Sequence, residues 1–141
     1  MPDPTNLSTD GYLYQLLARP IPSYPAVSAR HSVDIRDVAK AAVLSLLATK
    51  GHPGEQRRII LYGGSFTWTE AVREIALLRP MLKSRLVDGG DPHEDGEAMP
   101  VATLDTRKAK DILGLSSFIG WRESVVDAVD SILEREVTWS V

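Results

Sequence analysis

Hydrophobic positions along the chain repeat mostly at helical spacing and predict about five helices. Each longer helix places apolar side chains three or four positions apart on one face. Those faces are formed by Tyr12, Leu13, Leu16 and Leu17; by Ala39, Ala42, Val43, Leu46 and Leu47; by Trp68, Val72, Ile75 and Ala76; and by Val125, Val126, Val129, Ile132 and Leu133. A shorter helix is expected between residues 105 and 114. The pattern therefore predicts a mainly helical chain.

Local signals mark where these helices begin and end. Asp34 is a candidate N-cap for the second helix, which should run to about Thr49. Thr67-x-x-Glu70 has the spacing of a capping box. Gly114 is placed to end the fourth helix, and the last helix should start near Gly120. These signals fix the expected boundaries more closely than periodicity alone.

One segment predicts a strand. Residues 58–62 read Arg-Ile-Ile-Leu-Tyr, and consecutive apolar residues are typical of a strand covered on both faces in a parallel sheet. Such a strand must hydrogen-bond to neighbours, and the sequence offers no equally good partner. Val38, Ala41 and Leu44 also make the second helix apolar around most of its circumference, so we expect cover on more than one side. Both features predict packing partners outside this sequence.

Composition places the chain among ordinary soluble, cytoplasmic proteins of one domain. Its 141 residues are 43% hydrophobic and 25% charged, with a net charge of −3. No basic block indicates nucleic-acid binding, and the longest nearly apolar stretch, residues 41–48, is too short to cross a membrane. The absence of cysteine excludes disulfides, thiolate catalysis and cysteine-based zinc sites.

Several residues could have a chemical role, but a structural role is the better interpretation of each. Gly63-Gly64 and Ser65 after the strand fit a tight turn better than a phosphate cradle or a hydrolase nucleophile. The acidic loop at residues 88–100 lacks the spacing of a calcium loop, and no metal site is expected. Trp68 and Trp121 are expected to be core anchors. The histidines are far apart in the sequence and are not expected to act as general bases; they are His31, His52 and His93.

Four stretches, in order, resemble the extended short-chain dehydrogenases/reductases. The branch that they resemble contains dihydroflavonol reductases, cinnamoyl-CoA reductases and fungal aldehyde/ketone reductases. These stretches are residues 5–17, with Tyr-Gln-Leu-Leu; residues 33–41, Val-Asp-Ile-Arg-Asp-Val-Ala-Lys-Ala; residues 59–70, from Ile-Ile-Leu-Tyr-Gly-Gly to Thr-Glu; and residues 105–115, with Asp-Thr-Arg-Lys-Ala and Leu-Gly-Leu. The resemblance implies an α/β fold: the mainly helical C-terminal lobe of a Rossmann-type reductase, with one or two strands left from its parallel sheet.

Two departures from the family decide the expected activity. The chain has no glycine-rich cofactor turn near its start, and no tyrosine is followed four residues later by lysine. The family's acid–base chemistry and cofactor site therefore have no counterpart among these residues, and no catalytic residue is assigned. The resemblance still implies substrate contacts, for which we expect Tyr12, Gln15, Arg30 and His31. Arg30 would suit an anionic group through bidentate hydrogen bonds.

The expected function follows from this combination. Residues 1–141 would form a single substrate-side lobe of an NADPH- or NADH-dependent oxidoreductase acting on carbonyl or alcohol substrates. The dinucleotide-binding half would be its partner, and this chain alone would be inactive and bind no cofactor. One alternative is a stand-alone helical binding module without catalysis. Another is a small hydrolase using Ser65, which Ser65→Ala would test.

Overall fold

The computed structural model is mainly helical. It describes residues 7–18, 21–27, 31–48, 58–92 and 102–139. The described helices are α1 (Asp10–Gln15), α2 (Ile35–Leu47), α3 (Trp68–Leu78), the short 3-10 helix η2 (Pro80–Leu82), α4 (Arg107–Leu113) and α5 (Trp121–Glu136). These agree with the number and order of helices that the hydrophobic pattern predicts.

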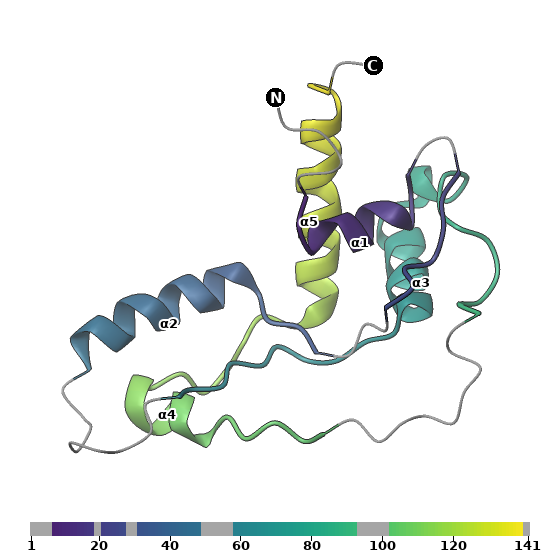
Figure 1. Ribbon diagram of the computed structural model, residues 1–141. Helices are drawn as coiled ribbons and strands as arrows, with labels where there is room; N and C mark the ends of the chain where they lie inside the picture. The colour runs from purple at the N-terminus through teal and green to yellow at the C-terminus, as the bar shows by residue number, and fades with distance from the viewer. Residues whose placement is uncertain (1–6, 19–20, 28–30, 49–57, 93–101, 140–141) are drawn as a thin grey trace.

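The helices form two separate groups, which are visible in Figure 1. In the first group, α5 packs against α1 and α3, and α3 is continued by η2. In the second group, α2 packs against α4. Within the described residues no helix of one group packs its backbone against a helix of the other. We call the first group the α5 body and the second the α2–α4 body.

Each body has its own hydrophobic core. The core of the α5 body includes Leu16, Leu17, Ile75 and Val129, all with no exposed surface. It also contains Trp68 and Trp121, as predicted. The core of the α2–α4 body is smaller and is formed by Ala41, Ala109, Leu113 and Leu115, with partly buried neighbours that include Leu44 and Phe118. No described residue belongs to both cores.

Helix ends follow the predicted local signals. Asp34 caps α2 by accepting the backbone N–H of Arg36 at 2.8 Å. Thr67 and Glu70 form a complete capping box at the start of α3. Gly114 ends α4 in the left-handed conformation, with φ of 70°, which favours glycine. These caps satisfy backbone groups that a helix leaves without partners.

The strand predicted at residues 58–62 does not form within the described residues. This segment has no strand pairing, and the nearest β-bridge joins Ser32 and Gly64 in an antiparallel sense. Ser32 donates its N–H to the Gly64 carbonyl at 2.8 Å, and Gly63 donates to the Ser32 carbonyl at 2.8 Å. A strand needs a ladder of such bonds, and here two of them join the segments. The segment therefore forms no regular strand within the described residues, where the sequence offers it no equally good partner.

Helix α2 is covered on one side only. Its covered side holds Ala41, Leu44 and Ala48, which pack in the core shared with α4. The opposite side repeats apolar residues every three or four positions, and we call it the outer face of α2; its residues are Ile35, Val38, Ala39, Ala42, Val43 and Leu46. Leu46 is 87% exposed and Ile35 76% exposed. The sequence predicts cover on more than one side, and the structure supplies it on one.

No helix in the described part of the chain combines the length and the apolar character needed to span a membrane.

Candidate functional site

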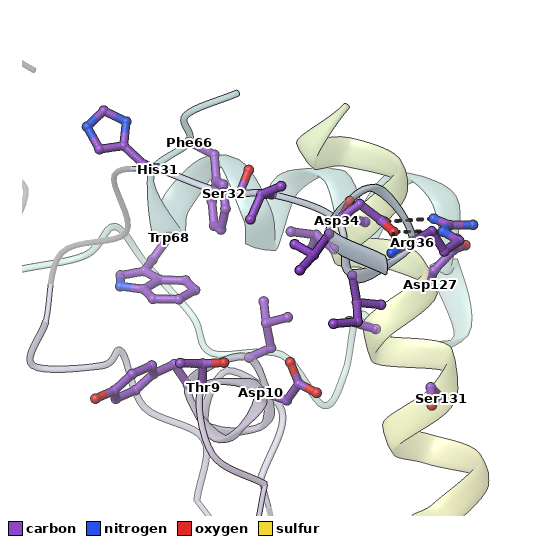
Figure 2. Close-up of a pocket in the computed structure, with 18 of the residues that line it drawn as sticks. Thr9, Asp10, His31, Ser32, Asp34, Arg36, Phe66, Trp68, Asp127 and Ser131 are labelled. Carbon is purple, nitrogen blue, oxygen red and sulfur yellow. Dashed lines mark hydrogen bonds and ion pairs between the residues drawn. The ribbon is translucent and has the colours of Figure 1, made fainter. Parts of the chain in front are cut away.

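A pocket of about 1020 Å³ lies between the two bodies. Helices α1 and α5 form one side of it, and the segment that leads into α2 forms the other, as Figure 2 shows. Its lining residues include Tyr12, Trp68 and Phe66 at one end and Asp34 and Arg36 at the other. The pocket is thus the place where residues far apart in the sequence meet.

The first end of the pocket is aromatic. Trp68 and Tyr12 have ring centroids 6.4 Å apart, and Phe66 meets Trp68 edge-on at 5.5 Å. Phe66 also stacks on Trp121 at 5.1 Å, which ties the pocket wall to the core of the α5 body. The Trp68 indole N–H donates to the Val27 carbonyl at 2.6 Å, so its orientation is fixed. This wall offers a rigid apolar surface to a ligand.

The second end of the pocket is polar and already internally paired. Asp34 is 5% exposed, and its carboxylate accepts two bonds from the Arg36 guanidinium at 2.8 Å. Ser124 on α5 donates its hydroxyl to Asp34 at 2.6 Å. Arg36 also pairs with Asp127 at 2.8 Å and with Glu123 at 3.4 Å. These groups therefore connect α2 to α5.

The electrostatics of this end follow from the same contacts. The Arg36 guanidinium, hydrogen-bonded to the Asp34 carboxylate, holds the pKa of Asp34 far below its ordinary value, against the opposing effect of burial. The Ser124 hydroxyl lowers that pKa further. In return, Asp34 raises the pKa of Arg36. A carboxylate held ionised in this way is a poor general acid or base at neutral pH.

The four residues predicted to bind substrate are not all brought together. Tyr12 and His31 both line the pocket, and the Tyr12 ring lies against that of Trp68 at the aromatic end. His31 is exposed, and its ring meets that of Tyr62 edge-on at 5.6 Å. Gln15 is not among the lining residues, and its backbone carbonyl accepts the N–H of Ser23. Arg30 lies outside the described residues.

The Gly63-Gly64 turn does not fit a dinucleotide phosphate. A Cβ at Gly63 would lie 2.5 Å from the Ile119 carbonyl oxygen, so this glycine is needed for close packing of two chain segments. The N-terminus of α3 that follows is occupied by its own carboxylate, because Glu70 accepts the Thr67 N–H at 2.8 Å. A phosphate placed there would meet a negative charge. These contacts favour the interpretation of Gly63-Gly64 as a tight turn.

Other candidates keep their structural roles. Ser65 is exposed on the turn and accepts a hydrogen bond from the Tyr62 hydroxyl at 3.2 Å. His52 and His93 lie outside the described residues. Within the part of the chain that the structure describes, no three acidic or histidine side chains gather as a metal site would require.

Sequence reasoning missed the polar end of the pocket. The sequence predicts Asp34 only as a helix cap, and Asp37 is not among the candidate residues above. Asp37 is 6% exposed and accepts the backbone N–H of Ile119 at 2.7 Å. Two aspartates three residues apart, both before or within the first helical turn, were the available signal, because one cap does not need two carboxylates. Nothing in the sequence pointed to Ser124 as their partner.

Solved structures similar to this one include two reductases in complex with NADPH. Yeast methylglyoxal/isovaleraldehyde reductase Gre2 matches with a TM-score of 0.61 and 23% identity, over 96% of this chain and 43% of that chain. Gre2 from Candida albicans matches with a TM-score of 0.65 and 28% identity, over 94% of this chain and 38% of that chain. The chain thus spans about two fifths of the length of these reductases. No protein-family model and no curated protein matches the sequence.

This likeness confirms the resemblance to the extended short-chain dehydrogenases/reductases and the mainly helical fold expected from it. Both neighbours are NADPH-bound reductases, so the structural relatives of this chain are oxidoreductases.

Proposed function

We propose that residues 1–141 form the substrate-side, C-terminal lobe of a larger cytoplasmic NAD(P)-dependent oxidoreductase. In this proposal a separate dinucleotide-binding half holds NADPH or NADH, and the complete enzyme interconverts a carbonyl compound and its alcohol. The hydride must come from the nicotinamide, because no side chain can donate one. The chain described here would shape the substrate pocket and be inactive alone.

The observation that carries the proposal is the exposed outer face of α2 next to the pocket. Ile35 and Val38 belong both to this face and to the pocket lining. A body that covered the outer face would therefore also close one side of the pocket. The matched reductases have more than half of their length outside the match, which is enough chain for such a body. Burying this apolar stripe would stabilise the assembly.

The substrate would lie against the aromatic end of the pocket. Tyr12 and His31 would contact it, since both line the pocket, whereas Gln15 and Arg30 are proposed contacts on the strength of the family resemblance alone. The wall formed by Tyr12, Phe66 and Trp68 suits small carbonyl compounds with an apolar body, such as the isovaleraldehyde named for yeast Gre2.

Dye binding tests whether the outer face of α2 lacks its partner. The purified chain should bind a hydrophobic dye and self-associate on size exclusion. Leu46→Lys should reduce both effects, because this leucine is 87% exposed at the C-terminal end of the apolar stripe. Leu77→Lys is the matched control: Leu77 is 71% exposed on α3, away from this face. Equal effects of the two substitutions would count against a specific interface.

Indole NMR signals test the pocket. Addition of 3-methylbutan-1-ol, the alcohol that reduction of isovaleraldehyde would give, should shift the Trp68 N–H signal. The Trp139 signal should stay in place, because Trp139 does not line the pocket. Uniform shifts, or none at saturating alcohol, would remove the pocket assignment. Oxidation of NADPH by this chain unaided would overturn the proposal that it is inactive.

The second candidate is a stand-alone helical binding module. The self-contained core of the α5 body favours it, since that core includes residues from both ends of the chain. A monodisperse chain that melts cooperatively and binds no dye would support the module. An aggregating, dye-binding chain would support the lobe.

A further inference from the structure

The two bodies are joined through extended segments and polar side chains. Residues 31–34, 61–66 and 115–120 pass between the bodies, and Figure 1 shows these segments crossing the middle of the molecule. The first two meet in the Ser32–Gly64 bridge, and Asp37 accepts the Ile119 N–H from the third. Because the two hydrophobic cores share no described residue, apolar packing does not fix the angle between the bodies.

The side chains that span the gap form one connected network. On the side of α2 it contains Asp34 and Arg36, and on α5 it contains Ser124 and Asp127. The bond from Ser124 to Asp34 is 2.6 Å, and the Arg36–Asp127 pair is 2.8 Å. All four residues line the pocket, so the network crosses the pocket's own edge.

We infer that these four residues are a polar latch that sets the opening of the pocket by holding the α2–α4 body against the α5 body. With the latch intact, Ile35 and Val38 line the pocket together with residues of α5. Without it, the α2–α4 body turns about the segments that join it to the α5 body, and the pocket changes width. Movement of two packed bodies about a few connecting residues is a common form of hinge.

The geometry also explains why the latch is polar. Hydrogen bonds and ion pairs are directional, so they define an angle, whereas an apolar contact tolerates sliding. Arg36 is about half exposed, so its pairs with Asp127 and Glu123 contribute modestly to stability. A link of this kind sets the position of α2, and breaking the link costs little free energy. The inference does not depend on the proposed enzymatic function.

The test removes the α5 side of the latch and measures the distance between the bodies. Ser124→Ala and Asp127→Ala, combined with Glu123→Ala because Glu123 also pairs with Arg36, leave the Asp34 cap of α2 in place, and alanine is favourable inside α5. The chain has no cysteine, so spin labels attach only where cysteine is introduced. Lys40→Cys on α2 and Glu134→Cys on α5, both exposed, report the separation by pulsed electron resonance.

Two controls separate latch opening from general loosening. Labels at Arg73→Cys on α3 and Glu134→Cys lie within one body and should keep their distance distribution. Asp130→Ala removes an ion pair with Arg79 inside the α5 body and should leave the α2–α5 distance unchanged. Circular dichroism confirms that each variant keeps its helix content.

We expect the latch variant to widen the α2–α5 distance distribution about twofold or to shift its mean by several ångströms. The inference is overturned if the distribution matches that of the parent chain. It is also overturned if the pair within the α5 body broadens equally, because the effect would then be loss of structure in general.

Discussion

Replacing Asp34 by alanine measures how far α2 depends on one buried carboxylate. The change removes the cap on the Arg36 N–H, which is worth about 1 kcal/mol. It also leaves the half-buried Ser124 hydroxyl without the charged acceptor 2.6 Å away, at a cost of about 1.5 kcal/mol. Loss of the ion pair with the half-exposed Arg36 guanidinium adds little to the decrease in the free energy of unfolding. We expect Asp34→Ala to lower the free energy of unfolding by about 2.5 kcal/mol.

The assay is urea denaturation followed by circular dichroism. We expect Asp34→Ala to lower the midpoint urea concentration and to leave unchanged the slope of the free energy of unfolding against urea. Asp105→Ala is the matched control, because Asp105 and Arg107 repeat the same Asp-x-Arg arrangement at the start of α4. There both side chains are more than half exposed, so the loss should be smaller. Equal losses in the two variants, or an unchanged midpoint for Asp34→Ala, would refute the reasoning.

The same carboxylate predicts a pH dependence with a definite sign. Its pKa in the folded chain lies well below the ordinary 3.8 because of the Arg36 guanidinium. The unfolded chain therefore takes up the proton first as the pH falls. The contribution of Asp34 to stability is fully present above the unfolded pKa and is lost as the pH falls toward the folded one. The stability difference between parent and Asp34→Ala should narrow from about pH 5 to about pH 3.

Two further substitutions test the packing. Ile75→Ala should lower the free energy of unfolding by about 2–5 kcal/mol, because Ile75 is fully buried in the α5 body; Leu77→Ala, 71% exposed on the same helix, should change it by less than about 1 kcal/mol. Similar losses in urea denaturation would contradict the assigned core. Gly63→Ala should lower the melting temperature, because its Cβ would meet the Ile119 carbonyl at 2.5 Å; Gly90→Ala, with open space around it, is the control. Equal melting temperatures of the two variants would contradict the close approach of Gly63 to the Ile119 carbonyl.

The helices could be predicted because their signals and partners are local. The capping box joins Thr67 to Glu70, and Asp34 caps a backbone group two residues away. Gly114 ends α4 through its own left-handed conformation. In each case the residue that marks the helix end also makes the contact there. The whole interaction therefore lies within a few neighbouring residues and can be found in the sequence.

The strand and the polar end of the pocket required distant partners. Residues 58–62 have the composition of a doubly covered strand, and composition cannot supply the neighbouring strands that would make it one. Ser124 is 90 positions from Asp34, and serine near a helix start is unremarkable in a sequence. Of the expected substrate contacts, Tyr12 and His31 line the pocket and Gln15 does not, because the sequence does not show into which cavity a helical residue points.

The pairing of α1 with α5 has a consequence for how the chain matures. The Tyr14 hydroxyl donates to Glu136 at 2.9 Å across 122 positions, and the Ser124–Asp34 bond spans 90. During synthesis, α1 therefore waits until α5 has been made before it finds its neighbour. Such long sequence separations slow folding and leave Leu16 and Leu17 open to chaperones until α5 has been made.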